Sequence, residues 1–266
     1  MAVFSEEGQI LKEHKFPTSP NYKSFLKDLS AALKEIQDYK ITVCCCALPA
    51  LIDRQRGIGI TFGNLKWQNV PAKDDLKDLL QGADIFLESD SNLAGLHESL
   101  VFKSQYHKVL YITIGTGIGD AVVVDGQLDE AYLDSEGGQM VLSRGGKLTK
   151  WEDFASGRAI VERFGKKAAD IDDPSIWKLY ASDLAQGLAT LIAPFQPDVV
   201  IIGGGVGAHF AKYGAFLNEE LKKYQNNMVT MPPVIQARKP EEAVIYGCYD
   251  FIRLRQGYGG QVRQNA

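Results

Sequence analysis

The stretch that decides the fold is YITIGTGIGDAVVVDGQL, residues 111–128. It holds two apolar runs with glycines between them, a pattern that predicts two strands joined by a tight turn. The first run begins two residues before this stretch, at Val109, and ends at Ile114; the second is Ala121–Val124, and the glycines are Gly115, Gly117 and Gly119. Backbone N–H groups in such a turn can approach phosphate oxygens closely, and the hydroxyl of Thr116 adds a donor. The same glycines also suit a hairpin without a ligand, so this segment alone leaves both interpretations open.

A second glycine-rich segment, DVVIIGGGVG at residues 198–207, is typical of a buried strand that leads into a helix. Gly203, Gly204 and Gly205 fall at the carboxyl end of that strand, where α/β proteins bring the backbone close to a flat or anionic ligand. The segment differs from the dinucleotide fingerprint GxGxxG, and no acidic residue follows on a strand about 20 residues later. The alternative is a strand–helix turn in which the glycines serve packing alone.

A carboxylate follows another predicted strand, in IFLESDSNLAGLHE at residues 85–98. Asp90 comes after the strand Ile85–Glu88 and directly before the predicted helix Asn92–Glu98. A carboxylate in this position can accept the proton of an alcohol while a phosphoryl group is transferred. The alternative is a helix cap, in which Asp90 or Ser91 accepts a hydrogen bond from a free N–H.

The polar segment between the two glycine-rich stretches, residues 134–160, holds further candidate ligand-binding groups. These are Glu136, Gln139 and Glu152. Carboxylates and amides suit a polyol, because each can bind two adjacent hydroxyls. The alternative is that all three are solvated loop residues.

Strands and helices alternate along the chain, which predicts the α/β class with a largely parallel, helix-covered sheet. Besides the elements above, the expected strands are Ala2–Phe4, Ile10–Phe16, Ile41–Leu48, Gly57–Phe62 and Val234–Ala237, and the expected helices lie near 25–36, 74–80, 152–164, 175–195, 210–224 and 243–253. Asp125-Gly126 predicts a further hairpin turn. The pattern predicts a small domain over 1–105, to which the last helix (about 243–254) returns, and a large domain over 106–242. The polar, glycine-rich tail 255–266 is expected to be disordered.

Composition excludes several classes of protein. The 266 residues are 45% apolar with a net charge of −4, which gives no basic face for a nucleic acid. No apolar run is long enough to span a membrane, and no signal peptide is recognisable, so we expect a cytoplasmic protein without membrane partners. Cys44, Cys45 and Cys46 alternate faces on one expected strand and cannot jointly bind a metal. We interpret them, with Cys248, as small core residues in a reducing compartment.

The order and spacing of the four segments resemble those of the ROK family of sugar kinases and repressors. GTGIG at 115–119 is similar to the family's second phosphate motif, and Gly203-Gly204-Gly205-Val206 to its adenosine motif. Glu88-Ser89-Asp90-Ser91-Asn92 resembles its E-N-D-A-N segment, and Glu136-Gly137-Gly138-Gln139 resembles its E-x-G-H segment. Glu152 before Phe154-Ala155-Ser156-Gly157, and Asn64-Leu65-Lys66-Trp67, match its other sugar-binding segments.

The resemblance implies a two-domain actin-like ATPase (ribonuclease H-like) fold with a central cleft. It implies that Asp90 is the catalytic base and that ATP and Mg²⁺ take part. The implied sugar-binding residues are Asn64, Ser89, Glu136, Gln139 and Glu152, and the implied nucleotide-binding residues are Gly115, Thr116, Gly117, Gly203, Gly204 and Gly205. It also suggests a homodimer or tetramer.

Four features depart from the family pattern. The sequence contains no D-x-G-x-T, the family's first phosphate motif, and its strand is missing before Ala2–Phe4, which leaves a strand edge exposed. Two explanations follow: the start of the gene is misassigned or truncated, or the protein has lost phosphate transfer. The zinc-binding histidine and cysteines are absent around Gln139, so no zinc is expected. Ser89 replaces an asparagine, and Asp120 stands in place of a small residue.

Two functions follow as hypotheses. The first is ATP-dependent phosphorylation of a hexose or an N-acylated amino sugar. The second is a catalytically inactive sugar- or nucleotide-binding homologue, which the missing motif favours. A repressor is disfavoured, because no DNA-binding segment precedes the first hairpin.

Overall fold

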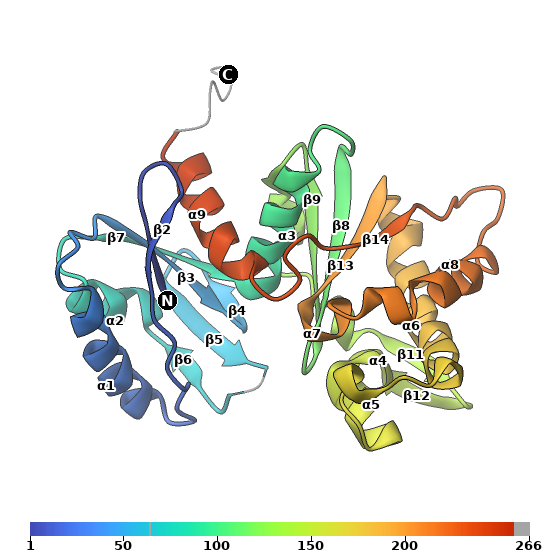
Figure 1. Cartoon of the computed structure of the whole chain (residues 1–266). Coiled ribbons are helices and arrows are strands. Elements are labelled where there is room, and N and C mark those ends of the chain that lie inside the picture. Colours follow the sequence, from blue (N-terminus) through green and yellow to red (C-terminus); the bar gives the residue numbers. More distant parts are fainter. Residues whose placement is uncertain (64, 258–266) are drawn as a thin grey trace. The chain divides into compact units, whose positions relative to one another are not determined.

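The computed structural model describes residues 1–63 and 65–257, and the contacts among them divide the chain into two compact units. The first unit comprises Met1–Leu93 and the chain from Val244 onward, and the second comprises Ala94–Ala243. Helix α3 (Asp90–Val101) begins in the first unit and continues in the second, and α9 (Ala243–Arg255) belongs almost wholly to the first (Figure 1). Asn64 and most of the predicted tail, 258–266, lie outside the described residues.

The first unit opens with the expected hairpin. Strands β1 (Ala2–Phe4) and β2 (Ile10–Glu13) pair antiparallel around a turn closed by Gly8, whose φ is 86°. Strand β3 (Val43–Leu48) pairs in parallel with β7 (Asp84–Ser89), and the long connection between them allows the crossover that parallel strands need. The other elements are α1 (Tyr22–Leu33), a 3₁₀ turn (Lys34–Ile36), β4 (Ala50–Asp53), β5 (Ile58–Phe62), β6 (Gln68–Val70) and α2 (Ala72–Leu79).

Trp67 lies in the apolar core of this unit. Its ring is in edge contact with Tyr22 and Phe62 and lies 4.9 Å from that of Phe25, and its Nε1–H donates to the carbonyl oxygen of Pro20 (2.9 Å). The segment Pro20–Tyr22 and strand β5 are thereby joined to one aromatic cluster. The antiparallel sheet β4–β5–β6 was not expected in full, since β4 and β6 are too short to show a period in the sequence.

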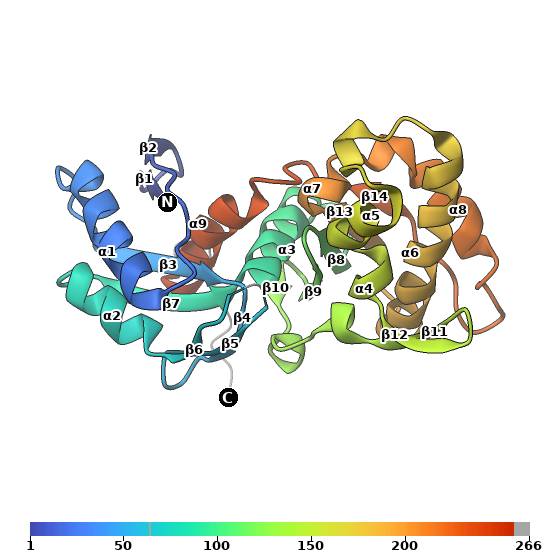
Figure 2. The same cartoon turned by 90° about the horizontal axis from the view of Figure 1, so that it is seen from below.

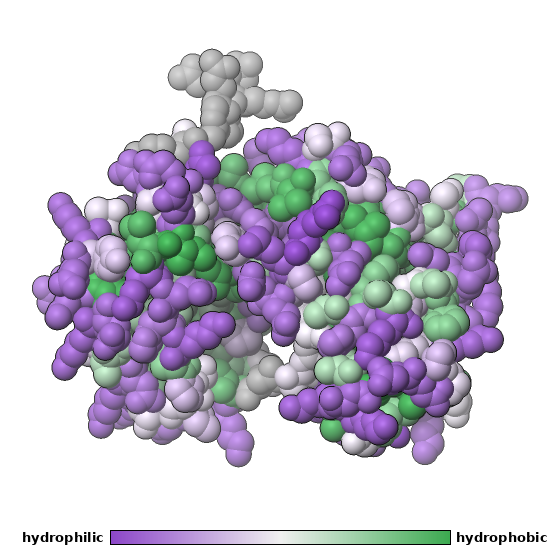
Figure 3. Space-filling view, viewed as in Figure 1, coloured by the Kyte–Doolittle hydropathy of each residue, from purple (hydrophilic) through white to green (hydrophobic). Residues whose placement is uncertain are grey.

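Two strand edges of the first unit face a cavity of about 870 Å³. Among the described residues β1 pairs with β2 and β3 pairs with β7, so each has a second edge without a strand partner. The cavity is lined by both strands and by Ile245, Cys248 and Ile252 of α9. Figure 2 shows the hairpin set apart from β3, and Figure 3 shows apolar surface in this part of the unit. The exposed edge expected from the sequence is therefore present.

The cysteines line this cavity and are half-buried, so they are less enclosed than core residues would be. All four are free thiols. Burial is the main reason that the pKa of Cys44 is raised to about 12, and it also raises the pKa of Cys46.

The described part of the second unit contains a mixed sheet in the order β10-β9-β8-β13-β14. Its strands are β8 (Lys108–Ile114), β9 (Ile118–Val124), β10 (Gln127–Leu128), β13 (Val199–Gly203) and β14 (Val234–Gln236). Only the pairs β8–β13 and β13–β14 are parallel, so the expectation of a largely parallel sheet was wrong. The reason is local, because the turns after β8 and β9 are too short for a parallel crossover. Asp125 and Gly126 both have positive φ (54° and 72°), which confirms the second hairpin turn.

The rest of the second unit packs around α6 (Pro174–Phe195), which begins at the cap Asp173 and ends at Gln196 in the left-handed region. Its core includes Trp151, Trp177, Tyr180 and Tyr213. The other elements are the hairpin β11 (Val141–Arg144) and β12 (Lys147–Lys150), the helices α4 (Glu152–Ala155), α5 (Gly157–Phe164), α7 (Gly204–Gly207) and α8 (Gly214–Lys222), and 3₁₀ turns at Glu130–Tyr132, Gly137–Gln139, Ala168–Asp170 and Phe210–Lys212.

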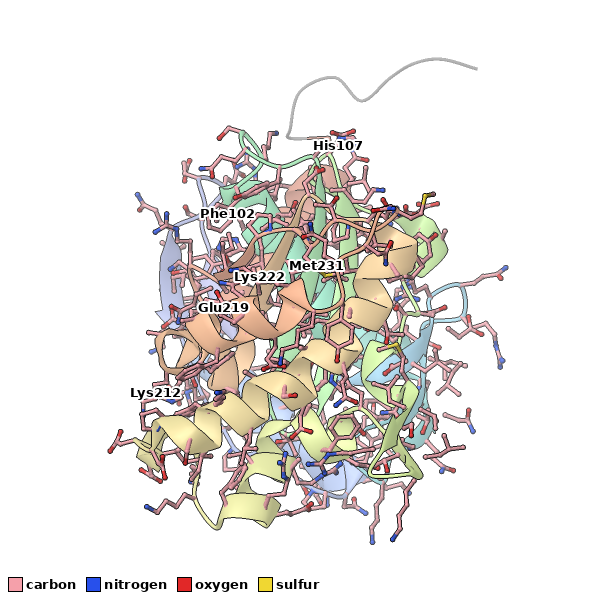
Figure 4. The ribbon with its side chains drawn as sticks, turned by 90° about the vertical axis from the view of Figure 1, so that its right-hand side faces the viewer. Phe102, His107, Lys212, Glu219, Lys222 and Met231 are labelled. Carbon is pink, nitrogen blue, oxygen red and sulfur yellow. The ribbon has the colours of Figure 1, made fainter. Side chains whose placement is uncertain are left out.

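Helices α6 and α8 lie side by side (Figure 4), and Lys222 and Glu219 on α8 form an ion pair of 2.7 Å. Two helices expected to be continuous are broken in the structure. The first breaks at Ser156, which caps α5, and the second breaks at Tyr213, whose ring is buried. No helix within the described ranges is long and apolar enough to cross a membrane.

Candidate active site

The turn after β8 is held by backbone hydrogen bonds on both sides. The N–H of Gly115 donates to the carbonyl oxygen of Gly117 (3.0 Å), and the N–H of Gly157 donates to the carbonyl oxygen of Gly115 (2.8 Å). Thr116 at its tip is exposed. The turn therefore joins the end of β8 to the first residue of α5.

The glycines of the two motifs fall into two kinds: some are required by close packing, and others leave open space beside the backbone. A Cβ on Gly203 would lie 2.2 Å from the hydroxyl of Tyr111, and one on Gly204, whose φ is 79°, would lie 2.6 Å from the carbonyl oxygen of Ile114. Packing alone therefore accounts for these two glycines. A Cβ on Gly115 or Gly205 would meet no described atom within 4 Å. These two positions are open, as a backbone cradle for a phosphate or nucleotide would be.

The two glycine motifs meet at one edge of the sheet. Strands β8 and β13 are parallel neighbours, with Thr113 opposite Gly203, so their carboxyl ends lie together. Gly204 then packs against the last residue of β8, and Gly157 of α5 packs against Gly115. Carboxyl ends of neighbouring parallel strands are a common ligand site in α/β proteins. The residues present fit the phosphates of a nucleotide, and the contribution of α5 had no recognisable signal in the sequence.

Glu152 joins the second set of candidates to this edge. One of its carboxylate oxygens accepts a hydrogen bond from Nε2 of Gln139 (2.9 Å), and the other lies against Gly117, where a Cβ would be only 2.6 Å away. Arg158 approaches the same carboxylate to 3.9 Å. Gln139 and Glu152 are therefore in direct contact and lie beside the glycine turn.

Glu136 belongs to the same loop as Gln139. It caps the 3₁₀ turn Gly137–Gln139, and its carbonyl oxygen accepts the N–H of Gln139 (2.9 Å). Both side chains are exposed. The loop is bonded to Asp120 of β9, whose carboxylate accepts the N–H of Gly137 (2.6 Å) and the hydroxyl of Ser135 (2.5 Å). Asp120 thus binds this loop with both carboxylate oxygens, and burial raises its pKa.

Asp90 is the first residue of α3, directly after β7. The helix-capping bond comes from another residue, because Oγ of Ser89 accepts the N–H of Asn92 (3.2 Å), three residues ahead. The carboxylate of Asp90 accepts the neighbouring N–H of Ser91 (2.8 Å). Burial raises the pKa of Asp90 above its ordinary value. Ser89 therefore supplies the capping bond three residues ahead, and Asp90 binds an N–H of the first helical turn beside it.

A buried ion pair fixes the turn that carries Ser89 and Asp90. Glu88 is 1% exposed, and Arg54 binds both of its oxygens, at 2.5 and 2.9 Å. The same carboxylate accepts bonds from Nδ2 of Asn92 (2.9 Å) and from the N–H of Ser89 (2.8 Å). Arg54 was missed from the sequence, because it lies 34 positions from its partner in an ordinary polar turn.

The structure thus gathers most of the predicted site residues in the second unit. These are Gly115, Thr116, Gly117, Glu136, Gln139, Glu152, Gly203, Gly204 and Gly205. Ser89 and Asp90 lie in the first unit, and Asn64 is outside the described residues. Within residues 1–63 and 65–257, no group of three or more His, Cys, Asp or Glu side chains is placed to hold a metal ion.

Comparison with known proteins identifies the fold and the family. A ROK family glucokinase from Streptomyces griseus, solved in complex with glucose and AMPPNP, superposes with a TM-score of 0.80 at 22% identity over 94% of each chain. The fold is accordingly the actin-like ATPase fold. The family model described as ROK family matches residues 1–253. A putative fructokinase of Bacillus subtilis is 30% identical, covering 77% of this chain and 73% of its own, and a glucokinase of Streptomyces coelicolor is 24% identical, covering 94% and 93%. The chain belongs to the ROK family.

Proposed function

We propose that the protein transfers the γ-phosphoryl group of ATP to a hydroxyl of a hexose or an N-acylated amino sugar. The observation that carries the proposal is the contact of Glu152 with both Gln139 and the glycine turn. Groups suited to sugar hydroxyls thereby lie directly beside a backbone turn suited to phosphate. The similar proteins named glucokinase and fructokinase support the same reaction.

In this reaction Asp90 accepts the proton of the attacking hydroxyl. Burial helps, because a raised pKa makes the carboxylate a stronger base than an exposed aspartate. Ser89 and Asn64 complete the sugar-binding set with Glu136, Gln139 and Glu152. Gly115, Thr116 and Gly117 bind the phosphates, while Gly203, Gly204 and Gly205 bind the nucleotide. Mg²⁺ enters with ATP and neutralises phosphate charge.

The test is release of ADP in a coupled assay with a panel of hexoses and amino sugars. The chain as printed is compared with a form extended at its N-terminus by a strand ending in D-I-G-G-T. We expect sugar-dependent ADP release that Asp90→Asn abolishes and Glu152→Gln weakens. Absence of turnover with every sugar, in both forms, would refute the proposal.

A second candidate function is binding of sugar or nucleotide without turnover. The sequence contains no D-x-G-x-T, so one phosphate-binding motif of the family pattern is missing from the printed chain. Thermal unfolding separates the two functions, because a binding protein is stabilised by its ligand but releases no ADP. A midpoint unaffected by every sugar and by ATP would rule this function out too.

A further inference from the structure

Asp120 is a carboxylate in an unusual place for an acidic residue. It lies on β9 of the central sheet, opposite Ile112 of β8, and is 1% exposed. Its neighbours along the strand, Ala121 and Val122, are core residues. Burying a carboxylate is costly unless hydrogen bonds satisfy its oxygens. The groups that hydrogen-bond to the carboxylate of Asp120 therefore indicate its role in the structure.

Both oxygens of Asp120 bind the same loop, one on each side of Glu136. Oδ2 accepts the hydroxyl of Ser135 (2.5 Å), and Oδ1 accepts the N–H of Gly137 (2.6 Å). The residue between these two anchors is Glu136, an exposed carboxylate. Hydrogen bonds to a carboxylate are stronger than neutral ones. The backbone on both sides of Glu136 is thereby fixed.

The loop lies directly on the sheet at this point. A Cβ on Gly138 would be 2.1 Å from the carbonyl oxygen of Ile118, and one on Gly137 would be 2.9 Å from Oδ1 of Asp120. The turn then continues to Gln139, whose N–H donates to the carbonyl oxygen of Glu136. A displacement at Gly137 is therefore passed on to Gln139 and to its contact with Glu152.

We infer that Asp120 is a positioning residue, which holds Glu136 and Gln139 in the orientation that binds the substrate hydroxyls. The inference rests on the proposed function for its substrate, and on the loop contacts alone for the anchor. Asp120 itself touches no substrate, because its carboxylate is enclosed between β9 and the loop. Misplacing binding groups by about 1 Å is enough to lower activity by about 100-fold.

The experiment compares Asp120→Ala, which removes both anchors, with Asp120→Asn, which keeps an acceptor for Gly137 and offers its amide to Ser135. Asp198→Ala is the control for loss of an aspartate that accepts two hydrogen bonds. Asp198 also accepts two N–H bonds, from His107 (2.9 Å) and Lys108 (2.7 Å), but at the opposite end of β8. Ser135→Ala removes only the hydrogen bond between Ser135 and Asp120, and it replaces Asp120→Ala in both measurements if that variant does not fold.

Two readouts are measured on the full chain. Amide hydrogen exchange at 135–139 is expected to lose protection in Asp120→Ala and to keep it in Asp120→Asn and Asp198→Ala. The KM for the sugar is expected to rise about 10- to 100-fold in Asp120→Ala, with the KM for ATP within about twofold. Asp120→Asn restores the sugar KM.

Unchanged amide hydrogen exchange at 135–139 in Asp120→Ala would refute the claim that Asp120 fixes this loop. Changed exchange with an unchanged sugar KM, or equal losses for sugar and ATP, would reduce Asp120 to a structural residue. If the wild-type protein phosphorylates no sugar, the proposed function fails. The hydrogen-exchange measurement then still shows whether Asp120 fixes residues 135–139.

Discussion

Replacing individual glycines by alanine separates ligand binding from packing at the paired glycine motifs. Gly115→Ala places a methyl group where no described atom lies within 4 Å, and Gly115 is not at a positive φ. The free energy of unfolding should stay unchanged or rise by up to about 1 kcal/mol, because alanine restricts the unfolded chain. Gly204→Ala instead forces a left-handed φ of 79° and a contact of 2.6 Å with Ile114. Conformational strain of about 1–2 kcal/mol and overpacking of about 1–3 kcal/mol add to a loss of about 2–5 kcal/mol.

Urea denaturation gives the two free energies, and the coupled ADP-release assay gives the KM for ATP. Gly115→Ala should fold like the wild type and raise the KM for ATP at least about tenfold, since the methyl group occupies the space that a phosphate would take. An intact fold with an unchanged KM for ATP in Gly115→Ala would refute the assignment of this turn to phosphate.

Three further predictions follow from the contacts. Arg54→Ala leaves the carboxylate of Glu88 buried without its cation, so the free energy of unfolding should fall by about 3 kcal/mol. This is near the low end for buried ion pairs, because the Arg54 side chain is 25% exposed. An unchanged midpoint in urea denaturation would contradict this prediction. The value of kcat/KM should fall as the pH decreases through the pKa of Asp90, because only the ionised carboxylate can accept a proton. The midpoint of this fall should lie above the ordinary aspartate pKa of 3.8. A pH profile that is flat down to pH 4, or that is unaltered in Asp90→Asn, would argue against Asp90 as the base. Glu98 is fully buried, and its two carboxylate oxygens accept the N–H groups of Arg238 and Lys239. Glu98→Gln leaves one of these N–H groups without an acceptor and should lower the free energy of unfolding by about 1–3 kcal/mol; an unchanged midpoint in urea denaturation would contradict this.

The sequence was informative where a strong local pattern coincides with a long element. The turn between Val109–Ile114 and Ala121–Val124, the helix near 175–195 and the strand before Gly203 are all present within a few residues of their expected bounds. Hydrophobic periodicity and glycine placement are local properties, and they specify such elements well. The short strands β4, β6, β11 and β12 give no comparable signal, since a run of three or four residues shows no clear period.

The candidate site was predictable as a set of residues but not as a set of contacts. The bond of Gln139 to Glu152 spans 13 positions, that of Asp120 to Gly137 spans 17, and that of Arg54 to Glu88 spans 34. Such pairs depend on how the chain returns on itself, which no local pattern encodes. Asp120 illustrates the limit, because the sequence placed it next to a phosphate turn and only the fold directs its carboxylate to the loop of Glu136.

The central claim is that this chain phosphorylates a sugar with Asp90 as the base. The most direct measurement is detection of sugar phosphate by phosphorus NMR after incubation with Mg²⁺–ATP and each sugar, for the wild type and for Asp90→Asn at equal concentration. The account predicts a new phosphomonoester signal with at least one sugar in the wild type, and its loss in Asp90→Asn while the variant still folds. An equal phosphomonoester signal in both proteins, or none in the wild type with or without the N-terminal strand, would contradict it.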